Sequence, residues 1–430
     1  MTRANQAQRS VEDQASNPDA KKRLTLSPRP YGRTAGAACY TAAMSPDPLL
    51  KWREEFPILA RKTYLINNSL GAMPRGVPAR LAHFAQMWND RGVVAWHDPP
   101  RDNWLDEAMS LANLIGSVFG AKAGCTMLHL NVATLTAQVL SSIDFSGPRN
   151  RIVYDDMQFT SPHYVCQAWT RYGAQLEIVK SDDGIGVDVQ KLCDAIDERT
   201  AIVPISHVYF RSGFLQDVKP VIEKAHKVGA RVLLDVYQSA GVVPFDVNEL
   251  DVDFVVGGSV KWVCGGPNVC YLYIRPDLMA GYKPALTGWI SHARPFKFEM
   301  EFEPASDAWR VSTGTPPVVA LYSARPGYEI IKQVGLEAIR EKSKRLTAHL
   351  VECALEAEFK VNSPRNAERR GGTVCIDFEG AEAAHYELIK REFIVDYRPG
   401  GGIRVSPHFY NTLEECDAIL AEMKGLRSRR

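Results

Sequence analysis

One lysine of the sequence stands where a charge is costly. Lys261 lies within VVGGSVKWVCGGPNVCYLYI (255–274), between two hydrophobic, strand-forming runs and shortly before two glycines. A lysine side chain is strongly hydrated and is rarely buried without a partner. In an apolar pocket that glycines keep open, Lys261 therefore needs either a paired carboxylate or a covalent partner.

A carboxylate stands one predicted strand earlier. Asp235 falls at the end of the hydrophobic run ARVLLDV (230–236). By itself an aspartate in this place is a helix cap or one half of an ion pair. A lysine that forms a Schiff base, preceded by an aspartate that pairs with a protonated pyridine nitrogen, suits chemistry with pyridoxal 5'-phosphate. The two residues together predict catalytic roles for Lys261 and Asp235 with that cofactor.

The elements around these residues alternate between strand and helix. Helical segments such as 189–198 and 218–229 lie between most of the short β-branched or aromatic runs. These runs cover residues 151–156, 174–181, 200–208, 230–236, 252–258 and 268–274. Strands that alternate with crossover helices predict an α/β fold with a mainly parallel sheet covered on both faces. Ligands of such sheets bind at the carboxyl ends of the strands, and Asp235 stands at such an end.

The chain divides into three predicted parts. Residues 1–43 are rich in small, polar and basic residues without a sustained period, which predicts a disordered N-terminal tail. Residues 44–320 form the predicted large, cofactor-binding domain with an N-terminal arm. Residues 321–430 form a smaller C-terminal α+β domain, since a long helical stretch (327–357) precedes two short strands and a final helix.

Composition limits the partners. The 430 residues are 45% hydrophobic and 23% charged, and a net charge of +1 calls for neither nucleic acid nor an anionic membrane surface. Nine scattered cysteines without a C-x-x-C pair indicate reduced thiols and a cytoplasmic location. Dispersed histidines without a carboxylate at ligand spacing predict no metal site. A small-molecule substrate is the partner that remains.

Nine stretches of the chain carry a family resemblance. They are YLINNSLGAMP (64–74), NVATLT (131–136), DDMQFTSPHYV (155–165), ISHVYFRSGFLQDV (205–218), DVYQSAG (235–241), GGSVKWVCGGPNVCYLYIRPDL (257–278), TGWISHARPF (287–296), RVSTGTPPV (310–318) and YRPGGGIRVSPHFYN (397–411). In order and coverage the chain resembles the class V aminotransferase superfamily of fold-type I pyridoxal phosphate enzymes, and within it the kynureninases. The resemblance implies a homodimer that acts on an amino acid.

The resemblance also implies roles for individual residues. Lys261 would hold the cofactor and Asp235 would face its ring nitrogen. Phe159 would stack on the ring, and Ala133 and Thr134 would bind the phosphate at a helix N-terminus. The other implied cofactor contacts are Ser161, Ser206, Gln238, Trp289 and Thr315, the last from the neighbouring subunit. On the substrate side the implied residues are Arg404, which would grip the carboxylate, with Asn68, Ser69 and His292.

Three positions depart from the kynureninase pattern. Val260 stands in place of a tyrosine directly before the lysine, and Pro162 stands in place of an aspartate. Gln238 stands in place of a histidine, and a glutamine here is typical of the aminotransferase and desulfurase branch, where it donates to the cofactor's phenolic oxygen. These departures concern the reaction and leave the predicted cofactor unchanged.

Three functions therefore compete. The first is kynureninase-like hydrolysis of a C–C bond, which yields an aryl acid and alanine. The second is an aminotransferase, epimerase or related lyase; sulfur transfer is disfavoured because the loop 362–372 has no cysteine and Cys375 falls in a predicted strand. The third is a non-catalytic binding protein, which the joint presence of Lys261, Asp235 and Arg404 argues against.

Overall fold

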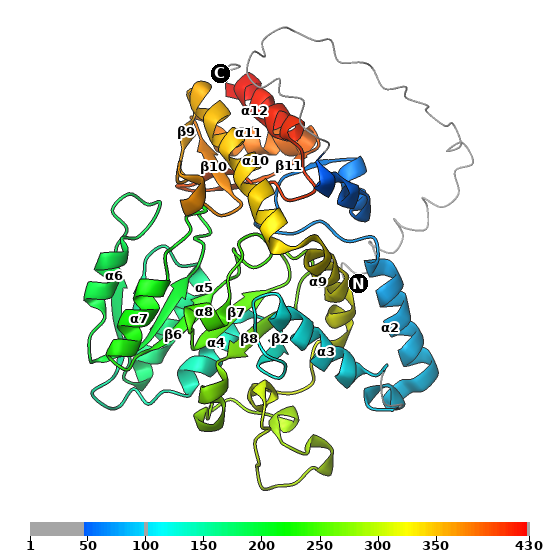
Figure 1. Ribbon diagram of the computed structural model, residues 1–430, viewed down its shortest axis with the longest axis vertical. Helices are drawn as coiled ribbons and strands as arrows, with labels where there is room; N and C mark the ends of the chain where they lie inside the picture. The colour runs from blue at the N-terminus through cyan, green and yellow to red at the C-terminus, as the bar shows by residue number, and fades with distance from the viewer. Residues whose placement is uncertain (1–46, 99–101, 428–430) are drawn as a thin grey trace, which may run out of the picture. The chain divides into compact units, whose positions relative to one another are not determined.

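The computed structural model describes residues 47–98 and 102–427 of the chain (Figure 1). The predicted N-terminal tail, residues 1–43, lies outside the described residues. Two main sheets organise the part from Pro48 onwards, one of seven strands and one of four. Among the described residues, no helix is both long enough and apolar enough to cross a bilayer.

The seven-stranded sheet is mainly parallel, as the alternating pattern predicts. Its strands β3 to β7 run parallel to one another, whereas β8 pairs antiparallel with both β7 and β2. The spatial order is β2 (Thr126–His129), β8 (Cys270–Ile274), β7 (Phe254–Gly258), β6 (Arg231–Asp235), β5 (Thr200–Ser206), β3 (Arg151–Asp155) and β4 (Gln175–Val179). Because β3 to β7 run in one direction, their carboxyl ends share one edge of the sheet.

Both faces of this sheet are covered by helices (Figure 1). On β6, Val232 and Leu234 join one apolar cluster while Leu233 joins another, because successive strand residues point to opposite faces. Helices α3, α6, α7 and α9 contribute to the first cluster, and α4 and α5 contribute to the second. The helices are α2 (Val77–Arg91), α3 (Trp104–Ser117), α4 (Val132–Ser141), α5 (Thr160–Trp169), α6 (Val189–Ala195), α7 (Lys219–Lys227), α8 (Val247–Leu250) and α9 (Val318–Val334).

The second sheet has its own helices and its own core, as expected for a smaller C-terminal α+β part. Its antiparallel strands are, in spatial order, β12 (Asp396–Arg398), β13 (Gly402–Val405), β10 (Val374–Asp377) and β9 (Lys360–Val361). Helices α10 (Leu336–Glu356), α11 (Ala381–Lys390) and α12 (Leu413–Arg427) pack with it around Leu350, Ile376 and Leu388. A short parallel pair, β1 (Thr63–Tyr64) with β11 (Phe393–Ile394), joins the N-terminal segment to this part. The boundary at residue 320 stays a prediction.

The helical stretch predicted over 327–357 is interrupted. Helix α9 ends at Val334 and α10 begins at Leu336, and Gly335 between them has a φ of +86°. Only glycine adopts such a backbone conformation without a steric penalty. The periodic pattern predicted the element type correctly, but a single glycine is also tolerated inside a helix, so the break was not predicted.

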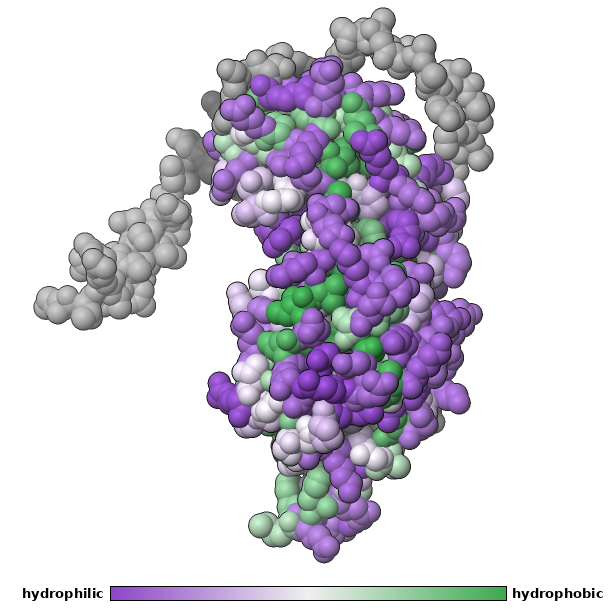
Figure 2. All heavy atoms as spheres, turned by 90° about the vertical axis from the view of Figure 1, so that its left-hand side faces the viewer, coloured by the Kyte–Doolittle hydropathy of each residue, from purple (hydrophilic) through white to green (hydrophobic). Residues whose placement is uncertain are grey.

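A segment without α-helix or strand joins β8 to α9 and carries exposed apolar side chains. Phe296, Phe298, Met300 and Phe302 alternate with charged residues, and Phe298 and Met300 are 72% and 100% exposed. The segment forms the lowest part of Figure 1, and hydrophobic atoms lie at the same end in Figure 2. Contiguous apolar side chains on a surface mark an interaction site. We call these four residues the apolar row.

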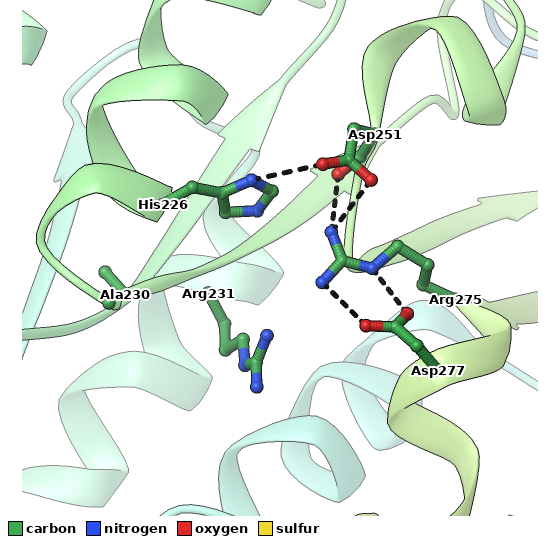
Figure 3. Close-up of a pocket in the computed structure, with 7 residues that line it drawn as sticks. His226, Ala230, Arg231, Asp251, Arg275 and Asp277 are labelled. Atoms are coloured by element: carbon green, nitrogen blue, oxygen red, sulfur yellow. Dashed lines mark hydrogen bonds and ion pairs between the residues drawn. The ribbon is translucent and has the colours of Figure 1, made fainter.

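The amino end of β6 borders a charged cavity of about 430 Å³ (Figure 3). Arg231 starts β6 there, about 13 Å from Asp235 at the other end of the strand. Arg275 lies between two carboxylates, at 3.1 Å from Asp251 and 2.7 Å from Asp277, and His226 is 3.6 Å from Asp251. These polar groups satisfy one another, so the arrangement supports the sheet and not a ligand.

Asp253, which is fully buried beside this cavity, gives a stability prediction. It accepts hydrogen bonds from the Val232 N–H at 2.8 Å, from His226 at 2.9 Å and from Arg231 at 3.0 Å. Asp253→Ala should lower the free energy of unfolding by about 2–3 kcal/mol, because it leaves the buried Val232 N–H without its acceptor and removes the carboxylate that pairs with Arg231. Urea denaturation measures this loss. The exposed Asp277→Ala should lose about 1 kcal/mol or less, and equal losses would contradict the prediction.

Candidate active site

A cavity of about 480 Å³ lies at the carboxyl ends of β5, β6 and β7. Asp235 pairs in register with Ser206 on β5 and with Val256 on β7. The predicted site residues that line the cavity are Ala133, Phe159, Ser161, Ser206, Asp235, Gln238 and Lys261. These residues come from five regions far apart in the sequence, and the parallel sheet brings them to one edge.

Lys261 is the cation of this cavity. Burial lowers the pKa of its amine to about 8, and the nearby carboxylate of Asp235 partly opposes this shift. Burial raises the pKa of Asp235, an effect opposed by the Tyr237 N–H, which donates to Asp235 Oδ1 at 2.8 Å, and by Lys261. A lysine with this pKa is mostly protonated near physiological pH, but its neutral fraction is far larger than that of an ordinary lysine, and the neutral amine is a nucleophile and a base.

The first turn of α4 faces the same cavity. Asn131 caps this helix, and its side-chain oxygen accepts the Thr134 N–H at 2.9 Å and the Thr134 hydroxyl at 3.0 Å. Val132 and Ala133 line the cavity at the helix N-terminus. The partial positive charge of this terminus favours an anionic group. Thr134 is already bonded to Asn131, so Ala133 is the better placed of the two predicted phosphate contacts.

A buried polar network holds the segment that presents Phe159. Ser206 Oγ donates to Gln158 Oε1 at 2.9 Å, and Gln158 Nε2 donates to Asp155 at 3.1 Å. Tyr209 also donates to Asp155 at 3.0 Å. Burial raises the pKa of Asp155 to about 6, although these hydrogen bonds oppose the shift. The network fixes the turn between β3 and α5, where Phe159 precedes the helix and its ring faces the cavity.

The N-terminal segment 64–74 packs tightly on the turn that contains Lys261. The Gly71 N–H donates to the Val260 carbonyl at 2.8 Å, and a Cβ atom at Gly71 would lie 2.2 Å from the Lys261 carbonyl oxygen. Only glycine permits this approach. It places Asn68 beside Gln238, whose Nε2 donates to the Asn68 carbonyl at 3.1 Å.

Arg404 is buried, and its guanidinium already has partners. Its Nε donates to Asp396 Oδ1 at 2.8 Å, its Nη2 bonds to Asp396 Oδ2, and its Nη1 donates to the Phe210 carbonyl at 2.7 Å. With the Asn68 amide oriented to satisfy its neighbours, its oxygen lies 2.9 Å from Arg404 Nε and accepts from it. The charge of Arg404 helps to lower the pKa of Lys261. Arg404 is thus near the cavity, but a substrate carboxylate would have to share it with Asp396.

Three predicted site residues lie on the segment between β8 and α9, apart from the walls of the Lys261 cavity in the described single chain. Trp289 stacks on Phe298, with ring centroids 6.2 Å apart. His292 is held within the segment, because its Nδ1 accepts the Arg294 N–H at 2.8 Å and its Nε2 lies 3.1 Å from the Glu301 carbonyl. Thr315 is exposed.

Ser69, a fourth predicted site residue, lies in a turn of the N-terminal segment, where its N–H donates to the Ile66 carbonyl. The roles of these four residues stay predictions.

The structure also brings residues to the cavity that were not predicted to act there. Tyr237 and Cys270 line it, together with the apolar side chains of Val208 and Phe210. Tyr237 stands between Asp235 and Gln238 in the sequence, and this position was the one feature of the sequence that could have indicated a place for Tyr237 in the cavity. Val260 and Pro162, the two apolar departures from the kynureninase pattern, line the cavity as well.

Other chemically capable groups are structural. Burial lowers the pKa of His207 to about 4 and that of His408 to about 3, so both stay neutral. Cys375 is buried in β10, and burial raises the pKa of its thiol to about 11, which makes it a poor nucleophile. On α10 and α12, His349 Nε2 lies 2.5 Å from Asp417 Oδ1, a hydrogen-bond distance too short for two ligands of one ion.

Comparison with known proteins places the chain in a class. Its fold matches an apo cysteine desulfurase of Thermococcus onnurineus NA1, with a TM-score of 0.79, 22% identity and coverage of 90% of this chain and 100% of that one. It also matches C-DES, in a structure described as a mutant with glycine covalently linked to the pyridoxal phosphate cofactor, with a TM-score of 0.77 and 20% identity over 88% of this chain and 99% of that one. The architecture is therefore that of fold-type I pyridoxal phosphate enzymes.

Sequence relatives narrow the class to a family. The aminotransferase class-V profile matches residues 115–419. A kynureninase of Burkholderia pseudomallei is 31% identical over 87% of this chain and 91% of its own length. An uncharacterized aminotransferase of Bacillus subtilis, YcbU, is 27% identical over 87% of this chain and 96% of its own length. The chain belongs to the aminotransferase class-V family and is an enzyme that depends on pyridoxal phosphate, so the non-catalytic alternative is set aside.

Proposed function

We propose that Lys261 binds the cofactor aldehyde and that Asp235 pairs with the pyridine nitrogen. The residues of the cavity fit this cofactor at each of its polar ends. A partly neutral amine and a buried carboxylate share one cavity, and the α4 N-terminus beside Ala133 suits the phosphate. Phe159 offers an aromatic face to the ring, and Ser161, Ser206 and Gln238 offer polar groups around it.

The pKa of Lys261 gives a pH prediction for the apoprotein. A base whose pKa is lowered to about 8 becomes neutral as the pH rises through 8. The rate at which the apoprotein binds pyridoxal phosphate covalently should therefore rise between about pH 7 and 9 and then level off, as followed by absorbance. Asp235→Asn should move this midpoint to lower pH, because Asp235 raises the pKa of the amine. A rate that keeps rising towards pH 10.5 would contradict the proposed environment of Lys261.

We further propose that the substrate is an amino acid with a bulky aryl side chain and that the reaction is kynureninase-like. The carrying observation is the Lys261–Asp235 cavity in a chain that shares 31% identity with a kynureninase over 87% of its length. Apolar walls at Val208, Phe210 and Val260 suit a bulky side chain. The side chain would carry a ketone at Cγ next to the aryl group, and hydrolysis of the Cβ–Cγ bond by one water would give an aryl acid and alanine.

The residues of the chain would act in a defined order. The bound cofactor supplies an electron sink for the electron pair left at the substrate Cα. Lys261, once its amine is released, takes the Cα proton and later returns a proton, and its lowered pKa suits both transfers. Asp235 keeps a negative charge beside the pyridine nitrogen. Arg404, oriented by Asp396, holds the substrate carboxylate so that the Cα–H bond stays aligned.

A second candidate is an aminotransferase, epimerase or related lyase. Gln238 favours it, because a glutamine at this position is typical of the aminotransferase branch. Its side-chain amide is held on the cavity wall by Trp262 Nε1 at 3.3 Å and by the Asn68 carbonyl at 3.1 Å. Val260 and Pro162 leave two positions of that wall without an ionisable group. Such a wall has fewer proton donors for the late steps of C–C hydrolysis than the kynureninase pattern has.

Product analysis separates the two candidates. The holoenzyme would be incubated with kynurenine, with 3-hydroxykynurenine and with a panel of common amino acids, each with and without a keto acid. Kynureninase-like activity predicts equal amounts of anthranilate-type product and alanine by mass spectrometry, without any need for the keto acid. A keto-acid product that forms only with an added acceptor identifies an aminotransferase, and an inverted amino acid identifies an epimerase. Either result would replace the first candidate.

We also propose that the enzyme is a homodimer with a cytoplasmic location and that the apolar row lies in the subunit interface. The row leaves four large side chains uncovered in one chain, and Trp289 and Thr315 share its segment. A second copy would cover the row and would bring these two residues to the partner's cavity. The proposal therefore accounts for the distance between Trp289, Thr315 and Lys261 within one chain.

The apolar row gives a prediction about assembly. Met300→Asp should shift the dimer towards monomer by at least about tenfold in the dissociation constant, because it places a charge in an apolar interface. Light scattering during gel filtration over a dilution series measures the shift. Lys297→Gln, a change of an exposed neighbour, is the control and should leave the mass unchanged. A wild-type monomer, or a variant as dimeric as the wild type, would contradict the prediction.

A further inference from the structure

Tyr237 occupies a place in the Lys261 cavity that the proposed chemistry leaves without a role. Its N–H donates to Asp235 Oδ1 at 2.8 Å, which ties its backbone to the carboxylate. Lys261 Nζ lies over the Tyr237 ring at 4.5 Å from the centroid, and it also lies over the Phe159 ring at 6.0 Å. The amine thus lies near the faces of two aromatic rings that come from different parts of the chain.

The direction of the Tyr237 side chain is fixed at its far end. Its hydroxyl lies 3.8 Å from Cys270 Sγ on β8, and the backbone N–H of Val132, at the start of α4, faces the same thiol. The side chain therefore reaches from Asp235 on β6, past β7, towards the α4 N-terminus. Asp235 and the α4 N-terminus are also the two groups that would hold the opposite ends of the cofactor. A flat ligand held between them would pass beside the Tyr237 ring.

Gly258, the last residue of β7, makes room for this ring. A Cβ atom at Gly258 would lie 2.5 Å from Tyr237 Cζ and 2.6 Å from its hydroxyl oxygen. Atoms do not approach so closely, so any side chain at position 258 would displace the tyrosine. The glycine has no positive φ that would demand it for the backbone. Close packing against Tyr237 is therefore the constraint that the structure shows at Gly258.

We propose that Tyr237 is a cofactor-binding residue that forms a second aromatic wall, opposite Phe159, and that Gly258 gives the wall its position. The inference rests on the proposed assignment of Lys261 and Asp235. An aromatic face attracts a flat, positively charged ring, so Tyr237 would stabilise the protonated pyridine that Asp235 also favours. The ring of Tyr237 is the active part, and its hydroxyl serves to anchor it near Cys270.

Cofactor affinity tests the wall. Apoprotein of each variant would be titrated with pyridoxal phosphate, with the absorbance and the circular dichroism of the bound cofactor as readouts. Tyr237→Ala should weaken binding about tenfold or more, and Tyr237→Leu, which keeps bulk without an aromatic face, about three- to tenfold. Tyr237→Phe should stay within about threefold of wild type. Thermal unfolding of the apoproteins shows that each variant folds, and the leucine variant serves if the alanine variant does not.

A double variant tests the role of Gly258. Gly258→Ala should weaken cofactor binding by displacing the ring, whereas Gly258→Ala combined with Tyr237→Ala should bind no worse than Tyr237→Ala alone, because the clash is then gone. Losses that multiply in the double variant would overturn the packing relation. Alanine and leucine variants that bind as tightly as wild type would overturn the wall. Borohydride labelling shows which of the two claims has failed. A label on Lys261, together with Tyr237 variants that bind the cofactor as wild type does, refutes the role of Tyr237 alone. A label on another residue refutes the assignment of Lys261 on which that role rests.

Discussion

Replacing Lys261 by alanine should abolish covalent cofactor binding and reduce turnover by at least about 10⁴-fold. In the proposed mechanism the variant loses the amine that binds the cofactor aldehyde and the base that moves the Cα proton, and general acid–base catalysis alone contributes up to about 10⁴-fold. The cavity keeps its other contacts, so the variant should still bind pyridoxal phosphate, reversibly and with the absorbance of the free aldehyde. Absorbance spectroscopy and a single-turnover assay measure the two losses.

The control for this change is a lysine outside the cavity. Lys283 is exposed on the segment that follows β8, and Lys283→Ala should keep both the spectrum and the turnover of the wild type. Adding a small amine such as methylamine should restore part of the activity of Lys261→Ala, because it supplies the missing base. A Lys261→Ala protein that retains the visible band and full turnover would show that another residue binds the cofactor.

Asp235→Asn should reduce turnover by about 10²–10³-fold while the covalent cofactor bond persists. An amide can accept a hydrogen bond, but it carries no negative charge to stabilise a protonated pyridine ring, and losing one preorganised electrostatic partner has an effect of this size. The Tyr237 N–H, which now donates to Asp235 Oδ1 at 2.8 Å, can donate to the amide oxygen, so the local backbone should hold. Turnover and the absorbance spectrum are the measurements.

Two variants separate the charge of Asp235 from its shape. Asp235→Glu keeps the charge and should retain more activity than Asp235→Asn. Asp246→Asn changes an aspartate that caps α8, and it should leave turnover unchanged. Equal activity of wild type and Asp235→Asn would contradict the role of Asp235, whereas loss of cofactor from the asparagine variant would assign the residue to binding more than to catalysis.

The parallel part of the sheet was predictable because its strands are short and contain β-branched residues, and all except the edge strand β4 are mostly buried. All residues of β5 are buried, so no polar alternation obscures the run. Strand β2 was not predicted, since Thr126–His129 has a single β-branched residue and only pairing with β8 makes it a strand. The direction of β8 was also not predicted, because hydrophobicity does not encode whether a strand runs parallel to its neighbour.

The candidate site likewise contains residues that the sequence indicated and residues that only the fold reveals. Asp235 and Lys261 follow hydrophobic strands, so local sequence indicated both. The bonds of Arg404 to Asp396 depend on the pairing of β12 with β13, which residue types alone do not reveal. Tyr237 resembles an ordinary aromatic residue in the sequence, and only its position between Asp235, Gly258 and Cys270 gives it a candidate role. Trp289, His292 and Thr315 do not line the Lys261 cavity of the described chain, and residue types alone do not reveal where a long connecting segment lies.

Borohydride reduction of the holoenzyme, followed by peptide mapping, tests the central claim most directly. The reagent makes a reversible lysine–cofactor bond permanent, so mass spectrometry can locate the pyridoxyl group. The expected result is one label per chain, on the peptide that contains Lys261, and no label after prior removal of the cofactor. A label on a different lysine, or a reduced protein without any pyridoxyl group, would contradict the account.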